Sequence, residues 1–216
     1  MERLCFAEAL TEEKRWDWEG IPVLTASLAL PQLEGAGRFN RYYRRFCRTY
    51  LAYCRELLLP EAAGSCRAAM ETSAPWSEAR AEVCWQVSFQ DGRLLSVLCD
   101  IQETVSGKAP FRLRRSEVWD LAMDLPVPLA EFFPGRWRKA LLAFARQETL
   151  RRVKAGAVCP ENWRSVLRRN LNPRNYYLTE EGLCFYYPSR CLGGAERFTL
   201  PYDGEKGPFP PALLSS

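Results

Sequence analysis

The chain has 216 residues and no histidine, and this absence narrows the chemistry that its side chains can perform. Histidine is the usual general base near neutral pH and the commonest protein ligand for transition metals. Without it, the chain cannot form Ser-His-Asp or Cys-His nucleophilic sites, imidazole zinc sites or facial-triad iron sites. Any catalysis would therefore depend on carboxylate, thiol, amine and phenol groups.

Carboxylates in the middle of the chain are the first candidates for acid–base chemistry: Asp100, Glu103, Glu117, Asp120 and Asp124. Two neighbouring carboxylates can act as acid and base when burial raises the pKa of one of them. Asp91, Asp120 and Asp124 fall where turns are predicted, and hydrogen bonds within turns are sufficient to account for them. Sequence spacing brings no two of these carboxylates together. We therefore expect a protein that is not an enzyme and has no catalytic residue.

The cysteines indicate structural thiols. The chain contains nine, an odd number, and no Cys-x-x-Cys motif occurs. We expect mostly reduced, buried thiols, with disulfides as the alternative. Cys66 and Cys159 lie near predicted loops, but without histidine a nucleophilic thiol would need Lys or Arg neighbours or a helix N-terminus. We expect no bound metal and no cofactor.

A basic segment covers residues 136–174, which contain eleven Lys and Arg residues and two Glu residues. Such a segment can attract phosphates, an acidic protein or a polyanion. The alternative is a solvated helix face on which some Arg stems cover apolar surface. No helix-turn-helix, RNA-recognition or zinc-finger pattern accompanies the segment. The residues that we predict to bind an anion here are Arg164, Arg168 and Arg169.

An aromatic stretch, NYYLTEEGLCFYYP at residues 175–188, has two tyrosine-containing runs on either side of Thr-Glu-Glu-Gly. This pattern predicts a β-hairpin with TEEG as its turn and with apolar side chains on both faces. We favour packing of the tyrosines into a core. The alternative is an aromatic platform for a protein or carbohydrate, for which Tyr177 and Tyr186 are the predicted binding residues.

Periodicity along the chain predicts the elements around these candidates. Residues 21–33 are predicted to form a strand, and residues 38–59 an amphipathic helix that ends near Pro60. Alternating patterns with Asp91-Gly92 between them predict a hairpin, and 109–121 a third strand. Helices are predicted at 136–155 and 161–171, and a last strand at 197–202. This order indicates an α+β fold in which helices cover an antiparallel sheet.

The location of the chain is predicted from what its sequence lacks. The first residues show no basic region followed by an apolar one, and no run approaches the ~18–20 apolar residues of a membrane span. A net charge of +4 is too weak by itself to indicate nucleic-acid binding. We expect a cytoplasmic protein without a membrane span.

The aromatic hairpin followed by RFTLPY resembles the C-terminal signature of the PdaC/RsiV-like domain family. The segment SEVWDLAMDLPVPLAEFF and the early IPVLTASLALPQLEG…FNRYYRRF are similar to other elements of that family, in the same order. The signature positions matched are Tyr176, Tyr177, Leu178, Thr179, Gly182, Leu183, Tyr186, Tyr187, Phe198, Leu200, Pro201 and Tyr202.

The resemblance spans residues 20–203 and implies one compact PdaC/RsiV-like unit. Residues 1–108 form its N-terminal half, 109–203 its C-terminal half, and 204–216 a Pro-rich tail. The family's Gly- and His-containing segment is replaced here by ETVSGKAPFRL, and the loop before RFTLPY is shortened.

Known members of the family include an anti-sigma factor that senses lysozyme and a peptidoglycan deacetylase with a separate catalytic domain. The resemblance therefore implies a bacterial, non-catalytic binding or sensing domain whose partner is a protein or a glycan-like ligand. The alternative function is an anion- or nucleic-acid-binding regulator that uses the basic helices within residues 136–171.

Overall fold

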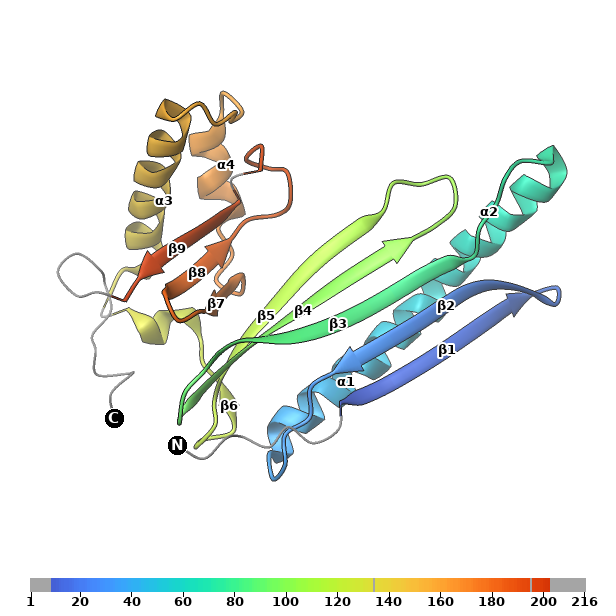
Figure 1. The fold of residues 1–216 in the computed structure, drawn as a ribbon, viewed down its shortest axis with the longest axis horizontal. Coiled ribbons are helices and arrows are strands. Elements are labelled where there is room, and N and C mark those ends of the chain that lie inside the picture. Colours follow the sequence, from blue (N-terminus) through green and yellow to red (C-terminus); the bar gives the residue numbers. More distant parts are fainter. Residues whose placement is uncertain (1–8, 134, 195, 203–216) are drawn as a thin grey trace. The chain divides into compact units, whose positions relative to one another are not determined.

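The computed structural model describes residues 9–133, 135–194 and 196–202 and shows a mixed α+β fold (Figure 1). A six-stranded sheet has the order β1-β2-β3-β4-β5-β6, and a three-stranded sheet has the order β7-β8-β9. The predicted α+β class with helix-covered strands is therefore confirmed. The Pro-rich tail at 204–216 lies outside the described residues.

The described residues divide into two compact units. Unit 1 comprises the described residues up to Gln86 together with Cys99–Arg115 and Met123–Leu125. Unit 2 comprises Val87–Leu98, Ser116–Ala122 and the described residues from Pro126 onward. Strands β3, β4 and β5 contribute residues to both units. The strands of the larger sheet are β1 (Leu10–Trp18), β2 (Ile21–Leu30), β3 (Ala79–Gln90), β4 (Leu94–Thr104), β5 (Phe111–Asp120) and β6 (Leu125–Pro126).

Strand β1 was not predicted, because its sequence LTEEKRWDW is polar and mostly exposed. It pairs antiparallel with β2, from Leu10 opposite Leu30 to Trp18 opposite Ile21. Glu19 and Gly20 between them both have positive φ, as a type I′ hairpin turn requires. A charged, exposed strand of this kind is typical of a sheet edge.

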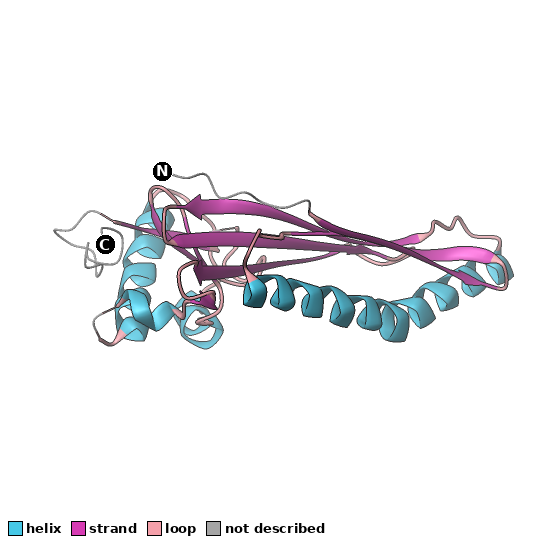
Figure 2. Cartoon of the chain, turned by 90° about the horizontal axis from the view of Figure 1, so that it is seen from below, coloured by secondary structure: helices cyan, strands magenta, loops and turns pink. Residues whose placement is uncertain are grey.

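Strands β2 and β3 pair in parallel, with Leu24 opposite Ala79 and Leu28 opposite Val83. This pair differs from the expected antiparallel arrangement. Parallel neighbours need a long crossover connection, which the helical segment after β2 supplies. In unit 1 that helical segment lies along one face of the sheet (Figure 2).

The crossover helix continues past Pro60, so the predicted end at that residue was wrong. Helix α1 (Gly37–Tyr53) is followed by a π-helical segment, Cys54–Leu58, and then by α2 (Leu59–Thr72). In the π segment the Leu59 N–H bonds the carbonyl of Cys54, five residues back. Proline lacks an N–H, and its ring clashes with the carbonyl four residues earlier in a regular α-helix. The wider π turn accommodates Pro60 without ending the helix.

The start of α1 is capped from far away in the sequence. The carboxylate of Asp124 accepts the backbone N–H groups of Arg38, at 2.6 Å, and Phe39, at 2.9 Å. These N–H groups have no partner within the helix, and a carboxylate at a helix N-terminus is stabilising. Asp124, for which the sequence predicted only a role in a turn, therefore also positions the start of α1.

Unit 2 contains α3 (Trp137–Lys154), α4 (Trp163–Asn170), and the strands β7 (Tyr176–Leu178), β8 (Gly182–Tyr186) and β9 (Arg197–Pro201). The predicted hairpin is confirmed: Tyr176 pairs with Phe185, Tyr177 with Cys184 and Leu178 with Leu183. The turn is also confirmed, because the Thr179 N–H bonds the Gly182 carbonyl at 2.9 Å.

The two faces of the hairpin are both covered. One face packs into the main core of unit 2, whose members include Leu141, Leu167, Tyr176, Leu178, Leu183, Phe185, Tyr187 and Phe198. The other face forms a small cluster of Tyr177, Cys184 and Leu98 with Tyr186 beside it. The alternation of the sequence therefore corresponds to two packed faces.

Candidate functional site

Three aromatic rings form a ladder along one side of α1. Phe46, Tyr50 and Tyr53 recur at four- and three-residue spacing, which places them on one face of a helix. The ring centroids of Phe46 and Tyr50 are 6.0 Å apart, and those of Tyr50 and Tyr53 are 5.7 Å apart. This side of α1 therefore carries a row of three aromatic rings.

Glu103 places a carboxylate against this ladder. It continues the inward alternation of Cys99 and Ile101 on β4 and is only 7% exposed. The Tyr50 hydroxyl donates to Oε1 of Glu103 at 2.9 Å, and the Tyr53 hydroxyl donates to Oε2 at 3.1 Å. Among the described residues, no Lys or Arg side chain forms an ion pair with Glu103. The buried carboxylate is thus held by two neutral donors.

The buried carboxylate also changes the acidity of its neighbours. Burial raises the pKa of Tyr50, and the hydrogen bond to Glu103 raises it further. Burial and the charge of Glu103 raise the pKa of Tyr53 to about 12. The same two causes raise the pKa of the Cys54 thiol to about 12. These groups are protonated at neutral pH, and a protonated phenol or thiol is a poor nucleophile.

A cavity of about 320 Å³ opens beside Glu103 in unit 1. We call it the Glu103 groove. Its rim includes Phe111 and Leu113 of β5, which are 50% and 45% exposed. Arg115 lies over the Phe46 ring at 4.9 Å and donates to the Tyr42 hydroxyl at 3.3 Å. The residues that define the groove are Phe46, Thr49, Tyr50, Tyr53, Ile101, Glu103, Phe111, Leu113 and Arg115.

We expect the free energy of unfolding to fall as pH rises through the range in which the Tyr53 hydroxyl loses its proton. Unfolded Tyr53 loses its proton near its ordinary pKa of 10.0, whereas folded Tyr53 keeps it until about pH 12. The raised pKa therefore stabilises the fold below pH 10.0, and this contribution is lost as pH rises through about 12.

Glu103→Gln should make this fall smaller, because it removes the charge of Glu103 and leaves burial as the main cause of the raised pKa. Urea unfolding across this alkaline range, with Asp100→Asn as a control, measures the difference. Glu103 also raises the pKa of Tyr50, so Tyr50 changes in the same direction as Tyr53 in this variant. The raised pKa values of Tyr176, Tyr177, Tyr187 and Tyr202 do not depend on Glu103, so these residues cancel in the comparison. An identical fall in wild type and Glu103→Gln would contradict the assignment.

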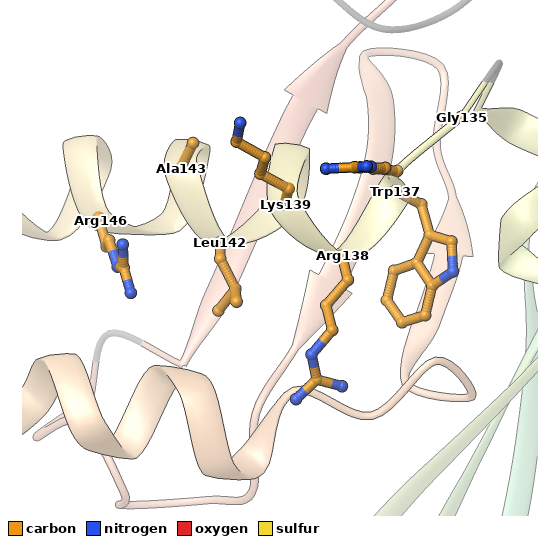
Figure 3. A pocket seen from close by; sticks show the side chains of 8 residues that line it. Gly135, Trp137, Arg138, Lys139, Leu142, Ala143 and Arg146 are labelled. Carbon is orange, nitrogen blue, oxygen red and sulfur yellow. The ribbon is translucent and has the colours of Figure 1, made fainter.

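A second, more basic hollow of about 640 Å³ lies at the start of α3 in unit 2 (Figure 3). Arg138, Leu142 and Arg146 extend from one side of the helix, and Lys139 from the other. The first turn of α3 has no side-chain cap and no acidic residue. The Arg138 guanidinium also donates to the carbonyl of Arg168, at 3.0 Å. The residues that line this hollow are Gly135, Arg136, Trp137, Arg138, Lys139, Leu142, Ala143 and Arg146.

The predicted binding arginines lie on α4. Arg164, Arg168 and Arg169 are all exposed, and Arg164 lies over the Trp163 ring at 4.5 Å. Their side chains do not line the α3 hollow. Part of the basic segment has a structural role: Arg152 covers the Phe198 ring at 4.8 Å and pairs with Glu148. Anion binding by the α4 arginines remains a prediction.

The predicted binding tyrosines lie together on the second face of the hairpin. The ring centroids of Tyr177 and Tyr186 are 6.0 Å apart. Tyr177 is 3% exposed, whereas Tyr186 is partly buried and its hydroxyl lies 3.0 Å from that of Ser116. Packing of the hairpin is confirmed, and a binding role for these two rings remains a prediction.

The other carboxylates considered from the sequence have separate structural partners. Asp100 accepts two hydrogen bonds from Arg114, and Asp120 pairs with Arg93 at 2.8 Å. Asp91 accepts backbone N–H groups within the β3–β4 turn, as predicted. Glu103 was a possible acid–base group by sequence, but its tyrosine partners could not be predicted from the sequence. Its place in the inward alternation after Ile101 was the signal that a charge would be buried there.

No three Cys, Asp or Glu side chains lie close enough to hold a metal ion in the part of the chain that the structure describes. Within the same residues, no helix is both long and apolar enough to cross a bilayer. Cys66 lies buried inside α2 and not near a loop as expected. In the part of the chain that the structure describes, the cysteines that form no disulfide are Cys47, Cys54, Cys66, Cys84, Cys99, Cys159, Cys184 and Cys191.

Comparison with known proteins supports the fold. No protein-family model and no curated protein matches the chain. The structure is similar to a crystal structure of a member of the DUF3298 family from Bacteroides fragilis, with a TM-score of 0.65 and 15% identity, covering 92% of this chain and 90% of that one. It is also similar to a DUF3298 family protein from Pseudomonas aeruginosa, with a TM-score of 0.59 and 14% identity, covering 93% and 92%. DUF3298 is the PdaC/RsiV-like domain, and the chain therefore has the fold of DUF3298 family proteins.

Proposed function

We propose that this chain is a member of the PdaC/RsiV-like family and serves as a non-catalytic binding domain that receives its ligand in the Glu103 groove. The observation that carries the proposal is a row of aromatic rings around a buried carboxylate, with exposed Phe111 and Leu113 at the rim. Ligand sites in proteins are typically apolar hollows with a few placed polar groups. Exposed large apolar side chains beside such a hollow favour contact with a partner.

Chemistry at the groove is disfavoured by the state of its groups. Tyr50 and Tyr53, which line the groove, have raised pKa values, so each holds its proton near neutral pH. The same holds for Cys54, which follows Tyr53 and does not line the groove. Asp100, the nearest carboxylate along β4, pairs with Arg114 instead of facing Glu103. A protein or glycan-like ligand is therefore the kind of partner that we propose. We also propose a cytoplasmic location, which the free thiols support.

The second candidate function is anion binding at the start of α3. Four basic residues, Arg136, Arg138, Lys139 and Arg146, line this hollow, and no acidic residue does. Backbone N–H groups at a helix N-terminus and nearby cations both favour a negatively charged ligand. The arrangement favours binding of a polyanion at this one hollow, whereas the charge of segment 136–174 alone indicates no particular place.

Arrays of immobilised peptides, oligosaccharides and heparin fragments can test both functions with the full chain. The groove variant combines Phe111→Ser with Leu113→Ser, the α3 variant combines Arg136→Ala with Lys139→Ala, and Val158→Ser is an exposed control. We expect peptide or oligosaccharide signals that are lost in the groove variant and kept in the other two. Signals that are equal in all variants would overturn the groove as a binding site. Loss of only the heparin signals, in the α3 variant, would favour the second function.

A further inference from the structure

Arg115 lines the same groove as Glu103, but no Lys or Arg of the described residues forms an ion pair with the Glu103 carboxylate. Each of its oxygens accepts one hydrogen bond from a tyrosine hydroxyl. A carboxylate oxygen has two lone-pair positions, so both oxygens can accept a further donor. Neutral donors only partly offset the cost of burying a charge, and a cation completes the compensation.

The walls of the groove also suit a cation. Tyr50, Tyr53 and Phe111 line the space next to Glu103. The faces of aromatic rings attract ammonium and guanidinium groups within about 6 Å. The groove already contains one such contact, because Arg115 lies over the Phe46 ring at 4.9 Å. A second cation, supplied by a ligand, would find both a ring wall and a carboxylate.

The size and openness of the groove favour a side chain carried by another protein. A volume of about 320 Å³ is at the small end of ligand pockets. A lysine side chain has an apolar stem and a compact charged head, so the stem can contact Phe111 and Leu113 while the ammonium group approaches Glu103. Because both rim residues are about half exposed, a partner surface can reach them without any opening of the fold.

From this arrangement we infer that the Glu103 groove binds a lysine side chain presented by a basic segment of a protein partner. The inference rests on the proposed binding function and specifies the ligand. An anionic ligand would be repelled by Glu103, and a neutral sugar would leave its charge without a cationic partner. A lysine side chain satisfies the carboxylate, the rings and the apolar rim together.

The test uses the full chain and two alanine-rich heptapeptides with blocked ends. One has a single central lysine, and the other has the same lysine acetylated, which keeps the stem and removes the charge. Chemical-shift titration of the backbone amides of α1, β4 and β5 gives the affinity and the location of binding. We expect the lysine peptide to bind in the groove about tenfold more tightly than the acetylated one.

Two matched variants separate the groove from general attraction. Glu103→Gln and Asp100→Asn each remove one negative charge from β4, but Asp100 pairs with Arg114 outside the groove. Glu103→Gln should weaken binding of the lysine peptide about tenfold and leave the acetylated peptide unchanged, whereas Asp100→Asn should alter neither. Added salt should weaken only the lysine peptide.

Equal affinities for the two peptides, or equal effects of the two variants, would overturn the inference. If the arrays show groove-dependent ligands while the lysine peptide does not bind, the binding function stands and the choice of lysine fails. If no array signal depends on the groove, both fail. Should Glu103→Gln not fold, Phe111→Ala replaces it and should weaken both peptides, because Phe111 supplies an apolar wall.

Discussion

Gly182→Ala is expected to lower the free energy of unfolding by about 3 kcal/mol, at the upper end of the usual cost of overpacking. A Cβ atom at this position would overlap the carbonyl oxygen of Leu200 and would lie 2.9 Å from the Cα of Pro201. Both atoms belong to the backbone of β9, in which Pro201 pairs directly with Gly182. Backbone on the partner strand cannot rotate away, so the strands must separate or shift.

Gly64→Ala is the matched control for this prediction. Gly64 is exposed inside α2, and a Cβ atom there would meet nothing within 4 Å. Alanine is favoured over glycine in a helix by up to about 1 kcal/mol, so this variant should be slightly more stable than wild type. Urea unfolding monitored by circular dichroism measures both variants. A Gly182→Ala protein as stable as wild type would contradict the close approach of β8 and β9.

Tyr177→Ala is expected to lower the free energy of unfolding by about 3–5 kcal/mol, the usual cost of removing a large buried aromatic side chain. Tyr177 is 3% exposed and packs with Leu98, Cys184 and Tyr186. Its ring is therefore an integral part of the packing between the hairpin and β4. Burial also raises the pKa of Tyr177, which agrees with an enclosed phenol.

Tyr177→Phe separates the ring from the hydroxyl. It keeps the packed ring and should cost only about 1 kcal/mol, the typical net value of a hydrogen bond. The same urea titration compares the two variants. A loss of only a few tenths of a kcal/mol in Tyr177→Ala would show that the ring is not needed for packing. Unchanged stability together with loss of ligand signals on the arrays would instead identify Tyr177 and Tyr186 as a binding platform.

Most local elements were predictable because their side chains alternate with a clear period. The strand at 21–33, the helix from 38, the hairpin around Asp91 and the aromatic hairpin at 176–187 all correspond to observed elements. Their apolar faces repeat every two or every 3.6 residues, which directly reflects backbone geometry. These are features that each segment carries in its own residues.

Elements without such a pattern were missed or misjudged. Strand β1 has charged residues on most positions and is recognised only through its pairing with β2. The helix at 136–155 was predicted, but its apolar residues do not by themselves identify its buried side: Leu150 and Val153 are 41% and 39% exposed, whereas Leu141, Ala145 and Thr149 are buried. Period is a weak guide where the apolar residues are spread around a helix, as they are on α3.

The candidate site was predictable only in its parts. The sequence shows an aromatic stripe on α1, and it places a carboxylate at an inward position of β4. Glu103 and Tyr50 are 53 residues apart, so only the packing of α1 against β4 brings them together. The hollow at α3 lies at the start of the predicted basic segment, but Arg164, Arg168 and Arg169 are not among the residues that line it.

By itself, the sequence determined most of the segments that form helices and strands, and that no histidine chemistry is possible. It also identified the hairpin at 176–187 and its turn, because alternation and turn residues are local properties. The tertiary structure alone decided that Asp124 caps a helix more than eighty residues away and that β2 pairs in parallel with β3. It also decided that Glu103 is enclosed by two tyrosines. These contacts depend on strand order and helix packing, which join distant segments and leave no periodic trace in either one.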